Sequence, residues 1–245
     1  MRPSSGSLSP DVDDSIITED AQNTKPFIEF NNLRPLTRKQ ERKLMDHLEE
    51  RFLDLTRNYK KRYLSEVSST LPTLSSYLQA TRIILSLVLQ IPPLDPSTSL
   101  RTAYLLRLTN DIMHSIPGYL PDTDTLPELL EWLDVLDRGW LAVLHSQAWD
   151  PVLSEGVDVI LTPGAPIMRS SPVTQTERTR LRSLLVTGTG TMEEWMESLD
   201  TEEEDYNSAL ERLGLQSGFD QLFFRSLTAM GGLGSAASDP AGMVG

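Results

Sequence analysis

Leucine and aromatic residues recur every three or four positions in four successive stretches between residues 36 and 148, and prolines separate these stretches. In the first stretch the recurring residues are Leu44, Leu48, Phe52, Leu55 and Tyr59. This spacing places the apolar side chains on one face of an α-helix, and that face must be buried against other helices. The pattern therefore predicts an all-α fold, an irregular helical bundle whose core spans residues 33–148.

Start and stop signals divide this core into four helices. A capping box of Thr37 and Gln40 begins the first helix, which is expected to end near residue 63. The three helices that follow are predicted over residues 73–90, 97–116 and 125–147. Ser97 is the expected N-cap of the third helix, and Gly139 in the fourth should let a neighbouring helix approach closely.

The pattern becomes weaker after the fourth helix. Residues 149–174 are rich in proline and glycine and are predicted to form an irregular loop, because a lone strand at residues 157–161 could not make a sheet. Residues 175–230 are predicted to form a helical, acidic C-terminal arm. Its first helix should stop at residue 186, before Gly188 and Gly190, and a later helix should end at Gly214.

Both ends of the chain are too polar or too small-sided to bury a core. Residues 1–32 are predicted to be a disordered acidic tail, apart from a short apolar island at residues 26–30, and residues 231–245 a second disordered tail. The start of the sequence has no apolar signal region, so we expect an intracellular protein, in the nucleus or cytoplasm. The longest strongly apolar stretch, residues 83–91, is too short to span a membrane.

Charge is distributed unevenly along this chain of net charge −13. Residues 34–62 contain ten Lys and Arg against five Asp and Glu, whereas residues 187–213 contain nine acidic residues and one arginine. Arg38, Lys39, Arg42 and Lys43 oppose the dipole at the start of the first helix and are predicted to meet an acidic protein surface. Nucleic acid is the alternative partner, and a third possibility is an intramolecular contact with residues 187–213.

Two apolar clusters in the C-terminal arm are candidate anchors for a partner groove. The first cluster is Trp195, Met196 and Leu199, and the second is Phe219, Leu222 and Phe223. If residues 219–230 form one helix, Phe219, Leu222 and Phe223 share a face. The alternative for both clusters is ordinary packing against the bundle.

Motifs for catalysis, metal binding or cofactor binding are not found in the sequence. There is no cysteine, and His47, His114 and His145 fall on three different predicted helices. The Gly188-Thr189-Gly190 segment lacks the rest of a phosphate-binding loop, and the acidic run lacks the oxygen spacing of a calcium loop. We therefore predict no metal, no cofactor and no enzymatic activity.

Three segments carry a family resemblance. They are LTRKQERKL at residues 36–44, LTRNYKKR at 55–62 and LDRGW at 136–140. Over residues 27–150 the chain resembles helical proteins of filamentous fungi, some with predicted names that invoke meiotic recombination. The resemblance implies a nuclear, chromosome-related accessory role. A RecA-like recombinase is excluded, because a Walker A motif and alternating strands and helices are both missing.

These observations favour a non-catalytic adaptor or subunit of an intracellular complex, with an unidentified protein partner. A small-molecule or enzyme site inside the bundle is the alternative, and its lining would include Tyr104, His114, Trp132 and Trp140. A nucleic-acid-associated factor that uses the basic first helix is a further alternative.

Overall fold

The computed structural model describes residues 33–62, 69–159, 170–199 and 205–232. The helices are α1 Arg38–Lys61, α2 Leu74–Leu89, α3 Ser97–Ser115, α4 Leu126–Leu144, α5 Gln175–Met196, α6 Tyr206–Leu213, α7 Gln216–Asp220 and α8 Phe224–Gly232. Short 3-10 turns, Ile116–Gly118 and Glu197–Leu199, follow α3 and α5. The predicted all-α bundle is confirmed. Of the predicted tails, residues 1–32 and 233–245 lie outside the described residues. The prediction that the C-terminal tail begins at residue 231 is wrong, because α8 continues to Gly232.

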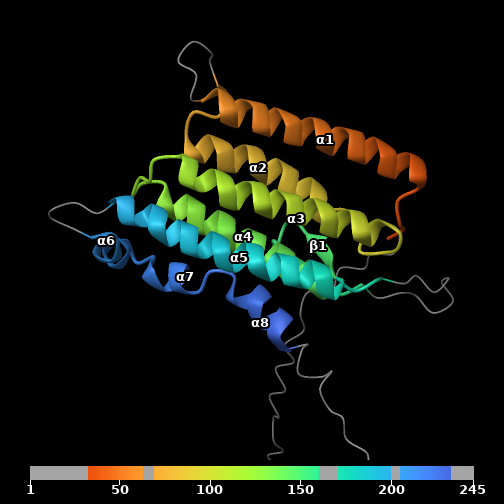
Figure 1. Ribbon diagram of the computed structural model, residues 1–245. Coiled ribbons are helices and arrows are strands. Elements are labelled where there is room, and N and C mark those ends of the chain that lie inside the picture. The colour runs from red at the N-terminus through yellow and green to blue at the C-terminus, as the bar shows by residue number, and fades with distance from the viewer. Residues whose placement is uncertain (1–32, 63–68, 160–169, 200–204, 233–245) are drawn as a thin grey trace, which may run out of the picture.

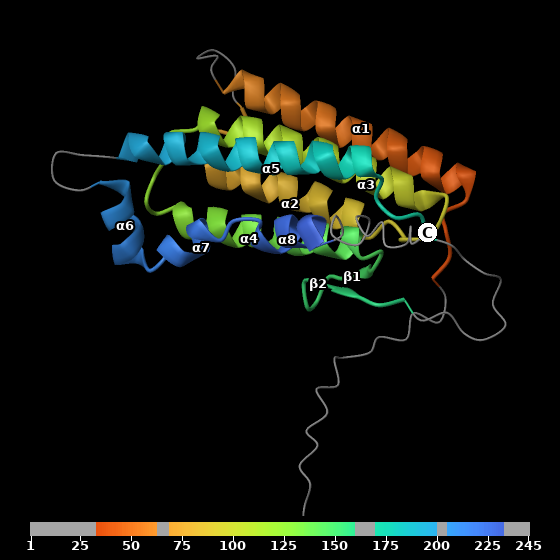
Figure 2. The ribbon, with the colours of Figure 1, turned by 60° about the horizontal axis from the view of Figure 1, so that its bottom comes forward.

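The chain reverses direction at each connection from α1 to α4 (Figure 1). Within the bundle, α2 packs against α1, α3 and α4, and α5 covers the other side of α3. Because α3 and α5 both begin at the end near the β-hairpin, these two helices run in the same direction. After α5 the chain turns back, and α8 lies against α4 (Figure 2).

Local capping explains where several helices begin. The side-chain oxygen of Thr37 accepts from the Gln40 backbone N–H, and Gln40 accepts in return from the Thr37 backbone N–H, so the predicted capping box is present. The prediction that Ser97 caps α3 is wrong. Pro96 is the N-cap and makes no side-chain cap bond, while the Ser97 hydroxyl donates to Glu41 of α1 instead.

Large side chains fill the centre of the bundle. Trp132 and Trp140 of α4 are completely buried, and the indole N–H of Trp140 donates to the Thr109 hydroxyl of α3 at 2.9 Å. Gly139 lies against Leu89, and a Cβ at this position would come within 3.0 Å of that side chain. The glycine therefore allows α4 to approach α2 closely, as expected.

The fifth helix is longer than predicted. It continues through Gly188 and Gly190 to Met196, and the prediction that the glycines end it at residue 186 is wrong. Gly188 is buried against Met113 of α3, where a Cβ would come within 2.6 Å of the sulfur. Packing on α3 outweighs the cost of about 1 kcal/mol for each glycine in a helix.

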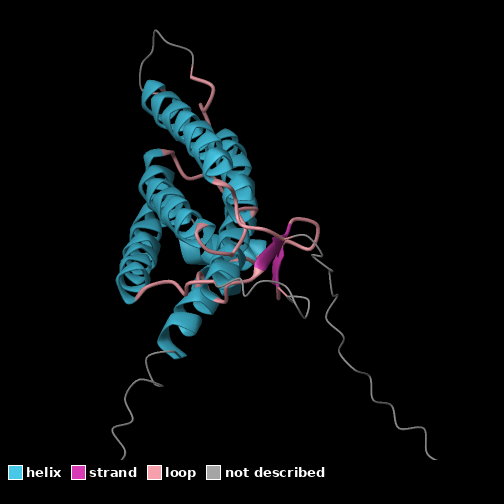
Figure 3. Cartoon of the chain, turned by 90° about the vertical axis from the view of Figure 1, so that its right-hand side faces the viewer, coloured by secondary structure: helices cyan, strands magenta, loops and turns pink. Residues whose placement is uncertain are grey.

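The region predicted as an irregular loop contains a β-hairpin (Figure 3). Strand β1, Ala148–Asp150, pairs antiparallel with β2, Glu155–Val157, and Ala148 lies opposite Val157. The expectation of no sheet is wrong because β2 finds a partner strand, β1, in the residues just after α4. This hairpin packs against α4.

The last apolar segment is two helices instead of one. Phe223, between α7 and α8, has a φ of +57°, which a bulky residue rarely adopts, so the chain changes direction there. Phe219 and Phe223 therefore do not share a helical face. The predicted end of the preceding helix is confirmed, since Gly214 caps α6 with a φ of +68°.

A candidate docking groove beside α4

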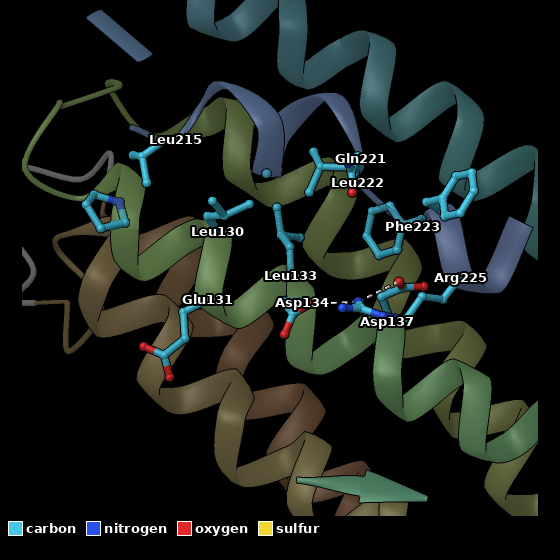
Figure 4. Close-up of a pocket in the computed structure, with 13 residues that line it drawn as sticks. Leu130, Glu131, Leu133, Asp134, Asp137, Leu215, Gln221, Leu222, Phe223 and Arg225 are labelled. Carbon is cyan, nitrogen blue, oxygen red and sulfur yellow. Dashed lines mark hydrogen bonds and ion pairs between the residues drawn. The ribbon is translucent and has the colours of Figure 1, made fainter. Parts of the chain in front are cut away.

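A groove of about 450 Å³ lies between α4 and the segment that leads from α7 into α8 (Figure 4). The α4 wall and the opposite wall both combine apolar and charged residues. Lining residues from α4 are Pro127, Leu130, Glu131, Leu133, Asp134 and Asp137. Lining residues from the C-terminal segment are Leu215, Gly218, Gln221, Leu222, Phe223, Phe224 and Arg225.

The turn between α7 and α8 buries one aromatic ring and exposes the next. Phe223 is 1% exposed and packs in the core, whereas Phe224 is 62% exposed at the edge of the groove. Leu222 and Leu130 are half-buried on facing walls. The groove thus offers apolar surface to a partner while its floor, which includes Leu133, remains part of the core.

Close approach of the C-terminal segment to α4 depends on a glycine. A Cβ at Gly218 would come within 2.5 Å of a methyl group of Leu130. The missing side chain lets α7 approach α4, so that the two elements can form the walls of one groove.

A buried carboxylate holds α8 in place. Asp137 of α4 is 2% exposed, and one of its oxygens accepts from the Ser226 backbone N–H at 3.0 Å and from the Ser226 hydroxyl at 2.6 Å. Its other oxygen accepts from Arg225 at 3.2 Å. These bonds join the start of α8 to the middle of α4 and so position Phe224.

Arg225 joins two carboxylates at the edge of the groove. Its guanidinium lies 2.7 Å from Asp134 and also bonds to Asp137. The bond to Asp134 raises the pKa of Arg225 above its ordinary value. Glu131 is paired with Arg82 of α2 at 3.2 Å, with both side chains exposed, so solvent weakens this pair. Glu131 is therefore the lining carboxylate most available to a cation from outside.

The predicted basic residues of α1 are all exposed. Arg38, Lys39, Arg42 and Lys43 make no ion pair with any other residue that the structure describes. They do not meet the acidic part of α5, because α1 and α5 run in the same direction and the acidic residues lie at the far end of α5 (Figure 1). The intramolecular contact proposed for residues 187–213 is thus not found for the described part of that segment; residues 200–204 lie outside it.

Most of the predicted C-terminal anchors point into the bundle. Trp195 is 6% exposed, and its indole N–H donates to the Tyr119 backbone oxygen at 2.7 Å. Met196 and Phe219 are buried, and Leu199 is half-buried against the core. Their expected role as exposed anchors does not fit these positions, because the core of the bundle already covers them.

Among the predicted anchors, only Leu222 lines the groove and keeps part of its surface exposed. The sequence analysis did not identify its neighbour Phe224 or the lining residues of α4. Asp137 carried a detectable signal, since a carboxylate between Leu133 and Trp140 falls on the buried stripe of a helix. A buried carboxylate needs donors from elsewhere in the fold, and Ser226 supplies them here.

The residues suggested for an internal ligand site do not converge. Trp132 and Trp140 are core residues with no exposed surface. Tyr104 donates to Glu49 of α1 at 3.1 Å, and burial raises the pKa of Tyr104 to about 12. His114 is exposed and bonds only to the backbone oxygen of Asn110 in its own helix.

The described residues contain no group of three or more His, Cys, Asp or Glu side chains that could hold a metal ion. In the same part of the chain, no helix has the length and apolarity needed to cross a bilayer.

Comparison with family models, with curated proteins and with solved structures finds no match to this chain. The resemblance to filamentous-fungal proteins therefore stays a prediction.

Proposed function

We propose that this protein is a non-catalytic interaction module, an adaptor or subunit that binds a segment of a protein partner in the groove beside α4. The observation that carries this proposal is the exposed ring of Phe224 at the edge of a groove whose walls also present Leu130 and Leu222. An exposed large apolar side chain at the edge of a groove is typical of a protein-binding surface.

The groove suits a short amphipathic helix. The wall residues Pro127, Leu130, Glu131 and Asp134 occupy successive turns of α4, and seven residues of helix extend about 10 Å. A partner helix of two to three turns would place anchors at i, i+3 and i+4 along this length. Three carboxylates and one guanidinium line the groove, so a partner with a basic residue beside its apolar anchors is favoured.

A small-molecule site is a weaker interpretation of the same groove. The polar groups that could orient a ligand, Asp134 and Asp137, are already bonded to Arg225 and Ser226. What the groove offers is chiefly apolar contact along an open side, which suits a peptide better than a small polar substrate.

The basic start of α1 is proposed as a second contact, for an acidic protein surface. Arg38, Lys39, Arg42 and Lys43 are exposed, and the positive end of the helix dipole adds to their field. Nucleic acid is the alternative partner, although the net charge of −13 disfavours a polyanion. We propose that the protein acts in the nucleus or the cytoplasm.

The test places a photo-crosslinking amino acid at position 224 in the full-length protein expressed in cells. A matched control carries the same crosslinker at Val186 of α5, which is 58% exposed and lies outside the groove. We expect one partner to crosslink stoichiometrically from position 224 and not from position 186. We further expect Phe224→Asp to abolish its co-purification, while Val186→Asp retains it.

Two results would contradict the proposal. One is that no partner crosslinks to the amino acid at position 224. The other is a partner that co-purifies equally with the Phe224→Asp variant. Because Phe224 is largely exposed, its substitution should leave the far-ultraviolet circular dichroism unchanged, which separates lost binding from lost folding.

A further inference from the structure

Polar atoms that are buried and lack a hydrogen-bond partner gather at one end of the bundle. Five of the eight such atoms among the described residues lie there: Thr98 Oγ1, Arg101 Nε, Arg101 Nη2, Ser170 Oγ and Arg178 Nη1. The other three, Trp132 Nε1, Arg138 Nε and Gln216 Oε1, belong to α4 and the start of α7. Thr98 and Arg101 lie in the first turns of α3, and Arg178 in the first turn of α5, so all are at the end where these two helices begin. This end is separate from the groove beside α4.

Arg101 is the least expected of these residues. Its side chain is 1% exposed, and its one hydrogen bond goes from Nη1 to the backbone oxygen of Gln147 at 2.7 Å. Burial, with no carboxylate beside it, lowers the pKa of Arg101 to about 10. A buried guanidinium normally has a paired anion, because removing its charge from water costs several kcal/mol.

Other bonds hold the remaining residues at the same end of the bundle. Asp95, just before α3, accepts from the Ser171 backbone N–H at 3.1 Å and from its hydroxyl at 2.7 Å, which holds Ser170 near the start of α3. Arg178 uses its Nε to donate to the Val173 backbone oxygen at 3.0 Å, so Nη1 is left over. The Ser97 backbone N–H donates to the Leu94 backbone oxygen at 2.9 Å, and the N-cap Pro96 supplies no side-chain acceptor for the N–H groups that follow.

The nearby carboxylates are used elsewhere. Asp95 bonds to Ser171, which lowers the pKa of Asp95, and the nearby Thr98 side chain adds to this lowering. Asp158 accepts from the side chain of Gln147. Asp150 is buried and accepts from two backbone N–H groups of its own turn. The sequence from residue 160 to residue 169 contains no Asp or Glu, so the stretch before Ser170 cannot supply a carboxylate side chain.

The unsatisfied groups share one chemical preference. Both guanidinium groups can only donate, both hydroxyls can donate, and the N-terminus of α3, which no side chain caps, points its positive end here. A water molecule could accept one or two of these bonds but would not neutralise the charge. A negatively charged group with several acceptor oxygens satisfies both needs.

We propose that this end of the bundle binds an oxyanion, the phosphate or carboxylate group of a small ligand, with Arg101 and Arg178 as its charge partners and Thr98 and Ser170 as further donors. The site is independent of partner binding at the groove, and either can fail without the other.

The test measures the thermal midpoint and the calorimetric affinity of the dialysed full-length protein with inorganic phosphate, sulfate or acetate, against potassium chloride at equal ionic strength. We expect an oxyanion to raise the midpoint, since it binds only the folded state. Arg101→Met and Arg178→Met should each weaken the affinity by about tenfold or more, as expected for a charged hydrogen bond. A higher affinity for phosphate than for acetate indicates a phosphorylated ligand. A higher affinity for acetate indicates a ligand with a carboxylate.

Arg180→Met is the matched control, because Arg180 is exposed two residues further along α5 and should leave the affinity unchanged. If Arg101→Met fails to fold, Arg101→Lys keeps the charge but loses the planar donors and should still weaken binding. The proposal is overturned if none of the oxyanions binds more tightly than chloride. Equal binding by the wild type and the folded Arg101 variant would overturn it too.

Discussion

Substituting Asp137 by alanine should release α8 from α4. Asp137 accepts three hydrogen bonds from two residues of the C-terminal segment, Ser226 and Arg225. Ser226 is fully buried, so alanine at position 137 leaves both the backbone N–H and the side-chain hydroxyl of Ser226 without these carboxylate bonds. Among the described residues, no other group accepts a hydrogen bond from the Ser226 backbone N–H.

The expected cost follows from these bonds. A buried polar group left unsatisfied costs about 1–3 kcal/mol, whereas the half-exposed pair with Arg225 contributes less than about 1 kcal/mol. Allowing the hydroxyl to keep its weaker bond to the Asp137 backbone oxygen, we expect the free energy of unfolding to fall by about 2–4 kcal/mol. The loss should be concentrated in α8, because its remaining anchors are the apolar residues around Met230.

Urea denaturation measures the total loss, and hydrogen exchange read by mass spectrometry locates it. Amides of α8 should exchange faster in Asp137→Ala, while those of α2 and α3 change less. Asp134→Asn is the control, since it removes only partly exposed ion pairs, with Arg225 and with Arg138, each of which should cost under about 1 kcal/mol. A free energy within about 0.5 kcal/mol of wild type, or unchanged exchange in α8, would refute this account of how α8 is held.

Two further predictions concern α5 and α1. Gly188→Ala should destabilise the protein by about 1–3 kcal/mol in denaturant unfolding, because the new methyl group meets Met113. Gly190→Ala has open space around it and should stabilise the protein by about 0.5–1 kcal/mol. Equal effects of the two substitutions would contradict the packing of α5 on α3. The bond to Arg107 lowers the pKa of Glu49 in the folded protein below its ordinary value of 4.5. The ionised Glu49 side chain therefore stabilises the fold fully above pH 4.5, and this stabilisation is lost as the pH falls through the lowered pKa of the folded state. The difference in free energy of unfolding between wild type and Glu49→Gln should therefore become smaller as the pH is lowered. A difference that stays constant with pH would contradict this role of the bond between Glu49 and Arg107.

Local signals in the sequence were sufficient for the bundle core. The stripe through Leu48 and Phe52, the Thr37 capping box and the prolines between helices describe interactions within one helix or across one turn. Such interactions depend on neighbours a few residues away, so the predicted α1 to α4 agree with the structure to within a few residues. The close approach of α4 to α2 at Gly139 was also foreseen.

Predictions failed where a distant segment decides the local conformation. Gly188 remains helical because Met113 of α3 covers it, and Phe223 turns inward because the floor of the groove receives it. The candidate anchors show the same dependence: spacing in the sequence identified Trp195 and Phe219 as apolar, but not which face would be covered. For side chains of this kind, burial is a property of the neighbours and not of the residue.

The sequence alone thus determined the helical class, the places where the core helices begin and the absence of cysteine chemistry. Only the tertiary structure decided which of its charges are buried and which apolar side chains stay exposed. Asp137 meets Ser226 across 89 positions of sequence, and Arg101 meets the backbone of Gln147 across 46. The groove and the proposed oxyanion site both arise from such pairings, because each needs side chains that converge in space from helices distant in the chain.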